Sequence, residues 1–327
     1  QVISRIEERL AVQIPVRSIF EMPTIGGLAV VIDHEKGVNE PIRHLALERV
    51  SRKGQLPISF AQQRLWFVDK MITDGSVYNI PAVLRFIGDL DHHSLERSIH
   101  EIIFRHEVLR IKFDVDDGQP FPIVDDFEAE PLVLEQVSGD SAGQIEKNAL
   151  AMAEQEAKWS FDLASGSLIR YRLLKLADED HIFIFNMHHI VSDGWSLGVL
   201  SHELNELYQA FHAGKTSPLP ALPVQYIDYA HWQKQWLEGD SLNQQIDYWK
   251  EQLSNGQVPT LDLPTDRPRP HQQSFRGAKV QQSISMELLV GLEDLSQEES
   301  ASLGMTFLAA FNLLLSRYAS QDDIVLG

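Results

Sequence analysis

The chain has 327 residues, 43% of them hydrophobic, no cysteine and a formal net charge of −19. This composition is sufficient for a folded core, excludes disulfides, thiolate nucleophiles and cysteine metal sites, and argues against a nucleic-acid partner, which requires a basic surface. No apolar run reaches the roughly 18 residues that a membrane-spanning helix needs, and no secretory signal opens the chain. We therefore expect a cytoplasmic protein without a membrane partner, and the lack of cysteine fits a reducing compartment.

The first 55 residues predict a small helical segment followed by a linker. Apolar residues at helical spacing, interrupted by Pro15, Pro23 and Gly26, predict three short helices within residues 1–33. So few residues bury little apolar area alone, so this segment is interpreted as a fragment of a helical domain. Residues 34–55 are charged and weakly periodic, as expected of a linker.

A mixed α/β unit is predicted from Leu56 onward. Apolar periodicity predicts helices over residues 59–72, 94–109, 141–159 and 197–211, the last ending at Gly214, and strands over residues 82–88, 111–113, 121–124, 168–176 and 181–191. Asp116-Asp117-Gly118 predicts a turn between the second and third strands, and Asp178-Glu179-Asp180 predicts a hairpin between the last two.

A proline-rich stretch at residues 218–223 marks the best candidate boundary between two lobes, at residues 56–220 and 221–327. The second lobe is predicted to hold helices near residues 225–253, a strand near 277–285, and helices over 286–297 and 305–319. Strands and helices alternate without a strict period, so the predicted fold class is α/β or α+β. The chain starts without methionine, and Asp323–Gly327 predicts the start of a strand, so we expect a piece of a longer protein.

Two adjacent histidines, His188 and His189, end the most apolar strand and precede Asp193 and Gly194. Histidine is the usual general base because its unperturbed pKa lies nearest neutrality. Strand alternation predicts that His188 shares a face with Ile182, Ile184 and Asn186, and that His189 shares the other face with Phe183, Phe185 and Met187. Adjacent strand residues cannot easily ligate one ion, so this arrangement disfavours a metal site.

Spacing alone leaves a structural role open for this pair, because most histidines in apolar strands are hydrogen-bonded core or surface residues. His92 and His93 form an equally tight pair at a polar helix start and are assigned no role. Gly194 is expected to permit a tight backbone at the entry to the next helix.

Four motifs occur in the order found in condensation domains of nonribosomal peptide synthetases, and the chain resembles that family over residues 56–327. They are SFAQQRLWF at residues 59–67, RHEVLRIKF at 105–113, HHIVSDGWS at 188–196 and YIDYAHWQ at 226–233, and the loop DRPRP at 266–270 commonly follows. Residues 1–33 resemble the C-terminal part of a peptidyl carrier domain. The motifs are most similar to those of domains that join an L-configured donor to an L-acceptor.

The resemblance implies a chloramphenicol acetyltransferase-like fold of two lobes, with the second lobe incomplete here. It also implies an acyltransferase that forms an amide bond between thioesters on upstream and downstream carrier domains, next to an adenylation domain. Phosphopantetheine arms of those carriers would deliver both substrates, and the domain itself would hold no cofactor and no metal. The carrier serine normally precedes the position of Gln1, so no cofactor-binding residue is expected. Because the rest of the second lobe is missing, we expect weak or no activity from this chain alone.

The resemblance assigns catalysis to His189, which would take a proton from the attacking amine or hold it by a hydrogen bond. His188, Asp193 and Gly194 would support the site: His188 by packing or hydrogen bonding, Gly194 by lining the donor path. Asp193 is expected to form a structural ion pair with Arg105 or with Arg269, and a structural ion-pair role is also considered for Arg110. Trp66 and Trp232 are interpreted as core aromatics.

Three alternatives remain open. An epimerisation domain shares HHxxxDG, but Trp195-Ser196 favours condensation. A free acyltransferase with a soluble acceptor is disfavoured by the carrier-like residues 1–33. A non-catalytic recruitment domain usually lacks one of the motif residues, whereas His188, His189, Asp193 and Gly194 are all present.

Overall fold

The structure is a computed structural model. It describes residues 2–10, 12, 14, 15, 18–38, 46–72, 74–253, 258–268, 270, 271, 275 and 277–326. The chain forms two compact units: one is Leu45–Ser241, and the other combines Gln1–His44 with Leu242–Gly327. Among the described helices, none is both long and apolar enough to cross a membrane.

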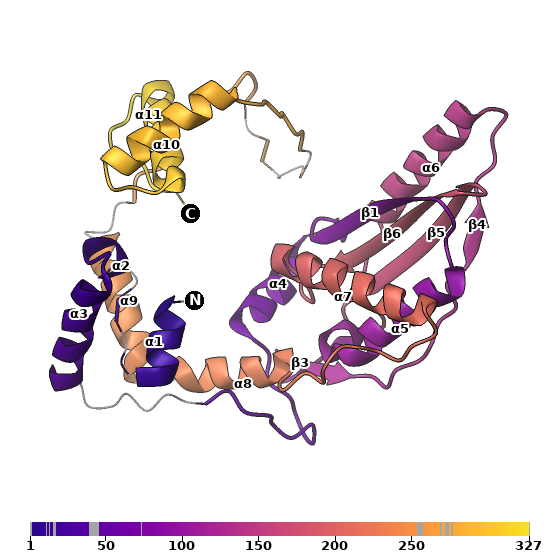
Figure 1. The fold of residues 1–327 in the computed structure, drawn as a ribbon, viewed down its shortest axis with the longest axis horizontal. Coiled ribbons are helices and arrows are strands. Elements are labelled where there is room, and N and C mark those ends of the chain that lie inside the picture. Colours follow the sequence, from indigo (N-terminus) through magenta and orange to yellow (C-terminus); the bar gives the residue numbers. More distant parts are fainter. Residues whose placement is uncertain are drawn as a thin grey trace. The chain divides into compact units, whose positions relative to one another are not determined.

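The unit Leu45–Ser241 is built on a four-stranded sheet with the order β1-β6-β5-β4 (Figure 1). β1 (Asn79–Ile87) pairs antiparallel with β6 (Asp180–His188), and β6 pairs antiparallel with β5 (Ile169–Ala177) in the predicted hairpin. β4 (Leu134–Gln136) adds a short parallel strand beside β5. The sequence does not predict β4, because three residues are too few to show a strand period.

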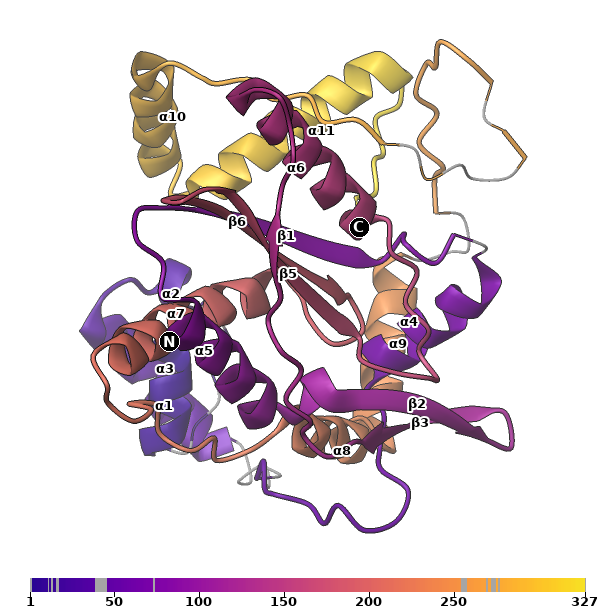
Figure 2. The same ribbon diagram turned by 90° about the vertical axis from the view of Figure 1, so that its right-hand side faces the viewer.

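The two faces of β6 enter two different cores, which confirms the predicted alternation. Phe183, Phe185 and Met187 belong to the main core, which α5 (His92–Arg105) and α7 (Gly194–His212) cover. Ile182 and Ile184 pack with Ala149 and Ala153 of α6 (Ala142–Ala157) on the opposite face. Figure 2 shows α6 on the side of the sheet away from α5 and α7. Full burial of each large apolar side chain contributes about 1.5–3 kcal/mol, so the register of β6 is strongly fixed.

Side-chain caps set the helix starts in this unit. Ser59 and Gln62 form a capping box at α4 (Phe60–Met71), Asp91 caps α5, and Ser141 caps α6. The prediction of one helix over residues 94–109 is wrong at its end, because His106 adopts an extended backbone with φ −101° and ψ 100°. The 3-10 helix η1 (Glu107–Arg110) follows instead.

β2 (Ile111–Asp116) and β3 (Gln119–Val124) form a separate hairpin. Asp117 and Gly118 occupy its turn with φ of +46° and +76°. Two successive positive φ values suit a tight hairpin turn, and Asp-Gly adopts them readily. The predicted turn is therefore confirmed.

The proline-rich stretch leads into α8 (Tyr226–Trp236). On α8 the Trp232 ring stacks between Tyr229 and Trp236, at centroid distances of 5.9 and 5.5 Å. Trp66 of α4 is buried in the main core, as predicted.

The regular secondary structure described in the second unit is helical. Its helices are α1 (Val2–Leu10), α2 (Ser18–Glu21), α3 (Ile25–Val38), α9 (Asp240–Gln252, which starts at the boundary between the units), α10 (Met286–Glu298) and α11 (Leu303–Ala319). Val12, Ile14 and Ile32 form a small core near α1 and α3. The hydroxyls of Ser296 on α10 and Thr306 on α11 lie 2.6 Å apart.

The predicted strand near residues 277–285 is wrong, because the described residues there have no regular secondary structure. The same holds for residues 323–326, where the start of a strand was expected. A strand needs a hydrogen-bonded neighbour, and the described part of this unit offers none at either place.

Candidate functional site

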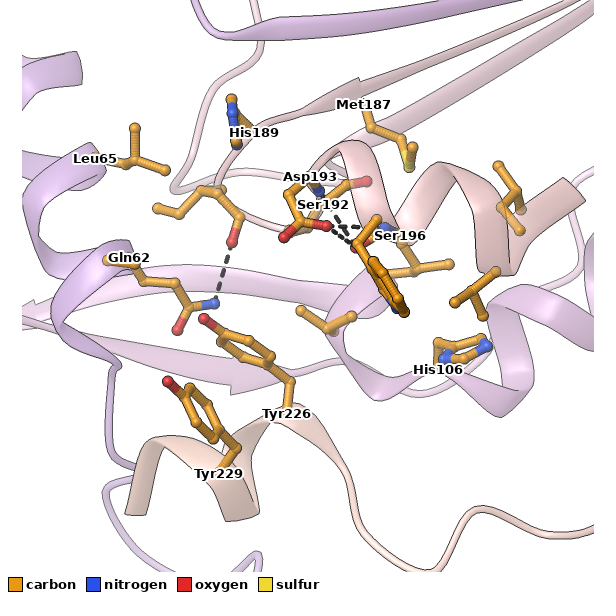
Figure 3. Close-up of a pocket in the computed structure, with 18 of the residues that line it drawn as sticks. Gln62, Leu65, His106, Met187, His189, Ser192, Asp193, Ser196, Tyr226 and Tyr229 are labelled. Carbon is orange, nitrogen blue, oxygen red and sulfur yellow. Dashed lines mark hydrogen bonds between the residues drawn. The ribbon is translucent and has the colours of Figure 1, made fainter. Parts of the chain in front are cut away.

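The unit Leu45–Ser241 contains a pocket of about 680 Å³ (Figure 3). Its lining comes from α4, the η1 region, the end of β6, the start of α7 and the start of α8. Most of the lining is apolar, and the polar groups include Gln62, His106, His189, Tyr226 and Tyr229. Pockets of roughly 300–1,000 Å³ with few polar groups are typical of binding and active sites.

His189 presents its side chain to this pocket, whereas His188 is buried with 1% of its surface exposed. β6 ends at His188, and the next backbone N–H, that of His189, donates to the carbonyl of Tyr78 over 2.7 Å. That bond continues the β1–β6 pairing by one residue and holds the His189 backbone while its side chain stays exposed. The expectation that the two histidines point in different directions is confirmed.

His188 is held as a neutral ring. Its Nδ1 accepts the Ile190 N–H over 3.1 Å, so the ring hydrogen lies on Nε2. Nε2 has no hydrogen-bond partner among the described residues; the Asp69 carboxylate lies 3.9 Å away. Burial, with a smaller contribution from His189, lowers the pKa of His188 to about 4.

This lowered pKa predicts a loss of stability on acidification. Between about pH 6.5, where an unfolded histidine titrates, and pH 4, the unfolded chain binds a proton at His188 that the folded chain does not. The free energy of unfolding should therefore fall by about 2–3 kcal/mol from this residue as the pH drops from 7 to 4.5. In urea unfolding, His188→Asn should lack this component while its amide oxygen still accepts the Ile190 N–H. An equal pH response of variant and wild type would contradict the assignment.

Asp193 caps α7 and does not form the predicted ion pair with Arg105. Its carboxylate accepts the Ser196 N–H over 2.8 Å and the Ser196 hydroxyl over 2.6 Å. These hydrogen bonds, from the hydroxyl first and then the backbone, lower the pKa of Asp193, and the positive end of the helix favours the anion. Arg269, the other predicted partner, lies outside the described residues.

The arginines of the second motif have other partners. Arg105 Nε lies 3.1 Å from Glu203, and Arg105 Nη1 donates to the carbonyl of Pro220 over 2.5 Å. Arg110 donates to the backbone carbonyls of Ile103 and Asp125. A structural ion pair is thus formed by Arg105, with a carboxylate that the sequence did not indicate.

The helix cap formed by Asp193 predicts a modest loss of stability that depends on which residue replaces it. Asp193→Ala should lower the free energy of unfolding by about 0.5–2 kcal/mol, whereas Asp193→Asn should stay near wild type because asparagine caps equally well. Thermal unfolding of both variants tests this. A loss for Asp193→Asn as large as for Asp193→Ala would show that charge, not capping, is what the site requires.

Gly194 does not need to be glycine for steric reasons. A β-carbon at this position meets no described atom within 4 Å, and its φ lies outside the left-handed region. The expectation of a tight backbone is therefore wrong. Its role in lining a donor path stays a prediction.

Gln62 and Tyr226 form a polar wall that the sequence does not single out individually. Gln62 Nε2 donates to the Ile190 carbonyl over 3.2 Å, which ties α4 to the loop after His189 (Figure 3). The Tyr226 hydroxyl lies 3.0 Å from that of Ser59, and burial raises the pKa of Tyr226. Both residues fall within the first and fourth motifs, which was the only signal available for them.

Sequence relatives are found among peptide synthetases. A family model described as the condensation domain matches residues 52–327. A linear gramicidin synthase of Brevibacillus parabrevis is 44% identical over 327 residues, which cover 100% of this chain and 6% of that protein. Gramicidin S synthase 2 of Aneurinibacillus migulanus is 37% identical over 326 residues, 100% of this chain and 7% of that protein. The chain thus spans a small fraction of these relatives.

Solved structures agree with the fold. The X-domain from teicoplanin biosynthesis is 29% identical with a TM-score of 0.74, covering 84% of this chain and 59% of that one. The first condensation domain of the CDA synthetase has a TM-score of 0.64 at 20% identity, covering 83% and 64%, a likeness of fold. The predicted fold class is confirmed, whereas the carrier-domain origin of residues 1–33 and the proposed domain boundaries stay predictions. The family model and the relatives together show that the chain belongs to the condensation domain family.

Proposed function

We propose that this chain forms amide bonds in a nonribosomal peptide synthetase. A donor aminoacyl or peptidyl thioester and an acceptor aminoacyl thioester would meet in the 680 Å³ pocket, each on the phosphopantetheine arm of a carrier domain. The observation that carries the proposal is His189, whose side chain is exposed in this pocket while its neighbour His188 is buried. A histidine in such a place is available to a substrate, and a buried one is not.

The reaction needs one nucleophile and one leaving group. The acceptor amine attacks the donor carbonyl carbon, the C–N bond forms, and the C–S bond breaks to release the donor thiol. His189 accepts the proton or hydrogen bond of the amine as positive charge develops on nitrogen, and the proton ends on the leaving sulfur. Since thioester aminolysis is already downhill, alignment of the two arms supplies a further share of the rate.

The partners in this proposal are the upstream and downstream carrier domains and a neighbouring adenylation domain, in the cytoplasm. The relatives' names, as synthases and synthetases of peptides, support this setting. The L-donor, L-acceptor preference indicated by the motifs belongs to the same proposal.

An assay in a complete condensation module tests the function. Donor and acceptor carriers are loaded, and the amide product is followed with the acceptor present or withheld. We expect product only when both are present. Inversion of the donor stereocentre without acceptor would indicate an epimerisation domain instead. Neither product nor inversion, with capture of a further protein, would indicate a recruitment domain.

A further inference from the structure

A second histidine, His106, lines the same pocket as His189. It lies between α5 and η1, with an extended backbone that places it outside both helices. Figure 3 shows His106 and His189 on opposite sides of the drawn pocket. The proposed reaction uses only His189, so the role of His106 is open.

A buried carboxylate fixes the ring of His106. Glu203 of α7, whose side chain is 8% exposed, places Oε2 2.7 Å from His106 Nε2 and Oε1 3.1 Å from Arg105 Nε. An ionised carboxylate only accepts hydrogen bonds, so His106 Nε2 must carry the hydrogen. In the neutral ring, Nδ1 is then a lone-pair acceptor.

His106 Nδ1 has no hydrogen-bond partner among the described residues. The polar lining residue Gln225 is engaged by the residues on either side of His106: its Oε1 accepts the Glu107 N–H over 3.1 Å, and its Nε2 donates to the Arg105 carbonyl over 2.9 Å. The lining residues close to His106 and Gln225 in the sequence include the apolar side chains of Val108, Leu109, Leu222 and Val224. The pocket thus offers an oriented acceptor in apolar surroundings, where a hydrogen bond is electrostatically stronger than in water.

We propose that His106 binds an amide N–H of the thioester-bound substrate through Nδ1, which makes it a substrate-binding residue of this pocket. The inference rests on the proposed function. A pocket of about 680 Å³ is far larger than the reacting thioester group, so a ligand centred at His189 extends well beyond it. Amide N–H groups occur both in a peptidyl donor and in the phosphopantetheine arm. Either group can donate a hydrogen bond to a neutral Nδ1.

The proposed hydrogen bond to His106 Nδ1 is tested in a complete condensation module by replacing an amide of the substrate with an ester. Three dipeptidyl donors are compared by kcat/KM: the natural one, one with an ester in place of its peptide N–H, and one with an ester in the pantetheine arm. Wild type should prefer the natural donor to one of the two esters by about 2- to 12-fold, the value of one neutral hydrogen bond. His106→Phe should abolish that preference. The ester whose discrimination disappears identifies the source of the N–H.

Glu203→Gln provides an independent variant. Arg105 can only donate, so the glutamine oxygen is expected to face Arg105 Nε and the glutamine NH2 to donate to His106 Nε2. The ring hydrogen then moves to Nδ1, so the same preference should be lost although the imidazole remains. His202→Phe, an exposed neighbour on α7 outside the pocket lining, should keep the preference. Because the preference is a ratio, partial unfolding of a variant cancels.

Two different failures can be told apart. A wild-type module that makes amide, but whose preference is the same in His106→Phe, contradicts the inference alone. A wild-type module that makes no amide contradicts the proposed function and this inference with it.

Discussion

Replacing His189 with alanine is expected to lower the rate of amide formation by about 10²- to 10⁴-fold, the usual contribution of one positioned acid–base group. The imidazole is exposed in the pocket, while the Tyr78 carbonyl holds its backbone N–H over 2.7 Å. The substitution therefore removes the functional group and leaves the strand pairing intact. The midpoint temperature of thermal unfolding should change little, since the His189 side chain is exposed.

The measurement is product formation between loaded carriers in a single turnover, with both carriers saturating so that neither their binding nor product release limits the rate. His93→Ala is a matched control, because His93 is a histidine of an equally tight pair, is 75% exposed and lies outside the pocket lining. It should retain the full rate. Undiminished product from His189→Ala would remove this residue from the mechanism and leave positioning of the arms as the source of catalysis.

The alternation of side chains along a strand was sufficient to predict that His188 and His189 point in different directions. Successive strand residues face opposite ways whatever surrounds them, and the apolar run before His188 is long enough to specify both its type and its faces. The turn at Asp117-Gly118 was predictable for a similar reason, because few residue pairs tolerate two positive φ values in succession. The motifs included Gln62 and Tyr226, the two residues of the polar wall. They did not predict the contact that each of these residues makes.

The ion pairs were not predictable, because they join residues far apart in the chain. The sequence suggested Asp193 as the partner of Arg105, since both lie in motifs. In the structure α5 and α7 pack side by side, and Glu203, near the middle of α7, meets Arg105 while Asp193 stays at the helix start as a cap. Which carboxylate faces a given arginine depends on how helices pack, and no spacing rule within one segment contains that information.

A second large effect is expected at Asp228, a carboxylate with no exposed surface near the start of α8. It accepts the backbone N–H groups of Val50 and Gln225, over 2.9 and 2.7 Å, and both Nη atoms of Arg52, over 2.6 and 3.1 Å. Burial alone would raise the pKa of Asp228, but hydrogen bonds from Arg52 and the two backbone groups outweigh it, and the pKa is lowered. The carboxylate thus joins residues 50–52 to α8 within the unit Leu45–Ser241.

Asp228→Ala should lower the free energy of unfolding by about 3–5 kcal/mol. It leaves the buried N–H of Gln225 and the partly buried N–H of Val50 without an acceptor, and it removes the carboxylate that both Nη atoms of Arg52 contact. Asp125→Ala is the matched control: Asp125 is 46% exposed and pairs with Lys112 over 2.8 Å, so its loss should cost no more than about 1 kcal/mol. Urea unfolding of the 327-residue chain measures both. Because these contacts anchor the segment at Arg52 to α8, Asp228→Ala should also speed proteolytic cleavage there. Equal destabilisation by the two variants would mean that Asp228, although buried, contributes no more than a surface charge.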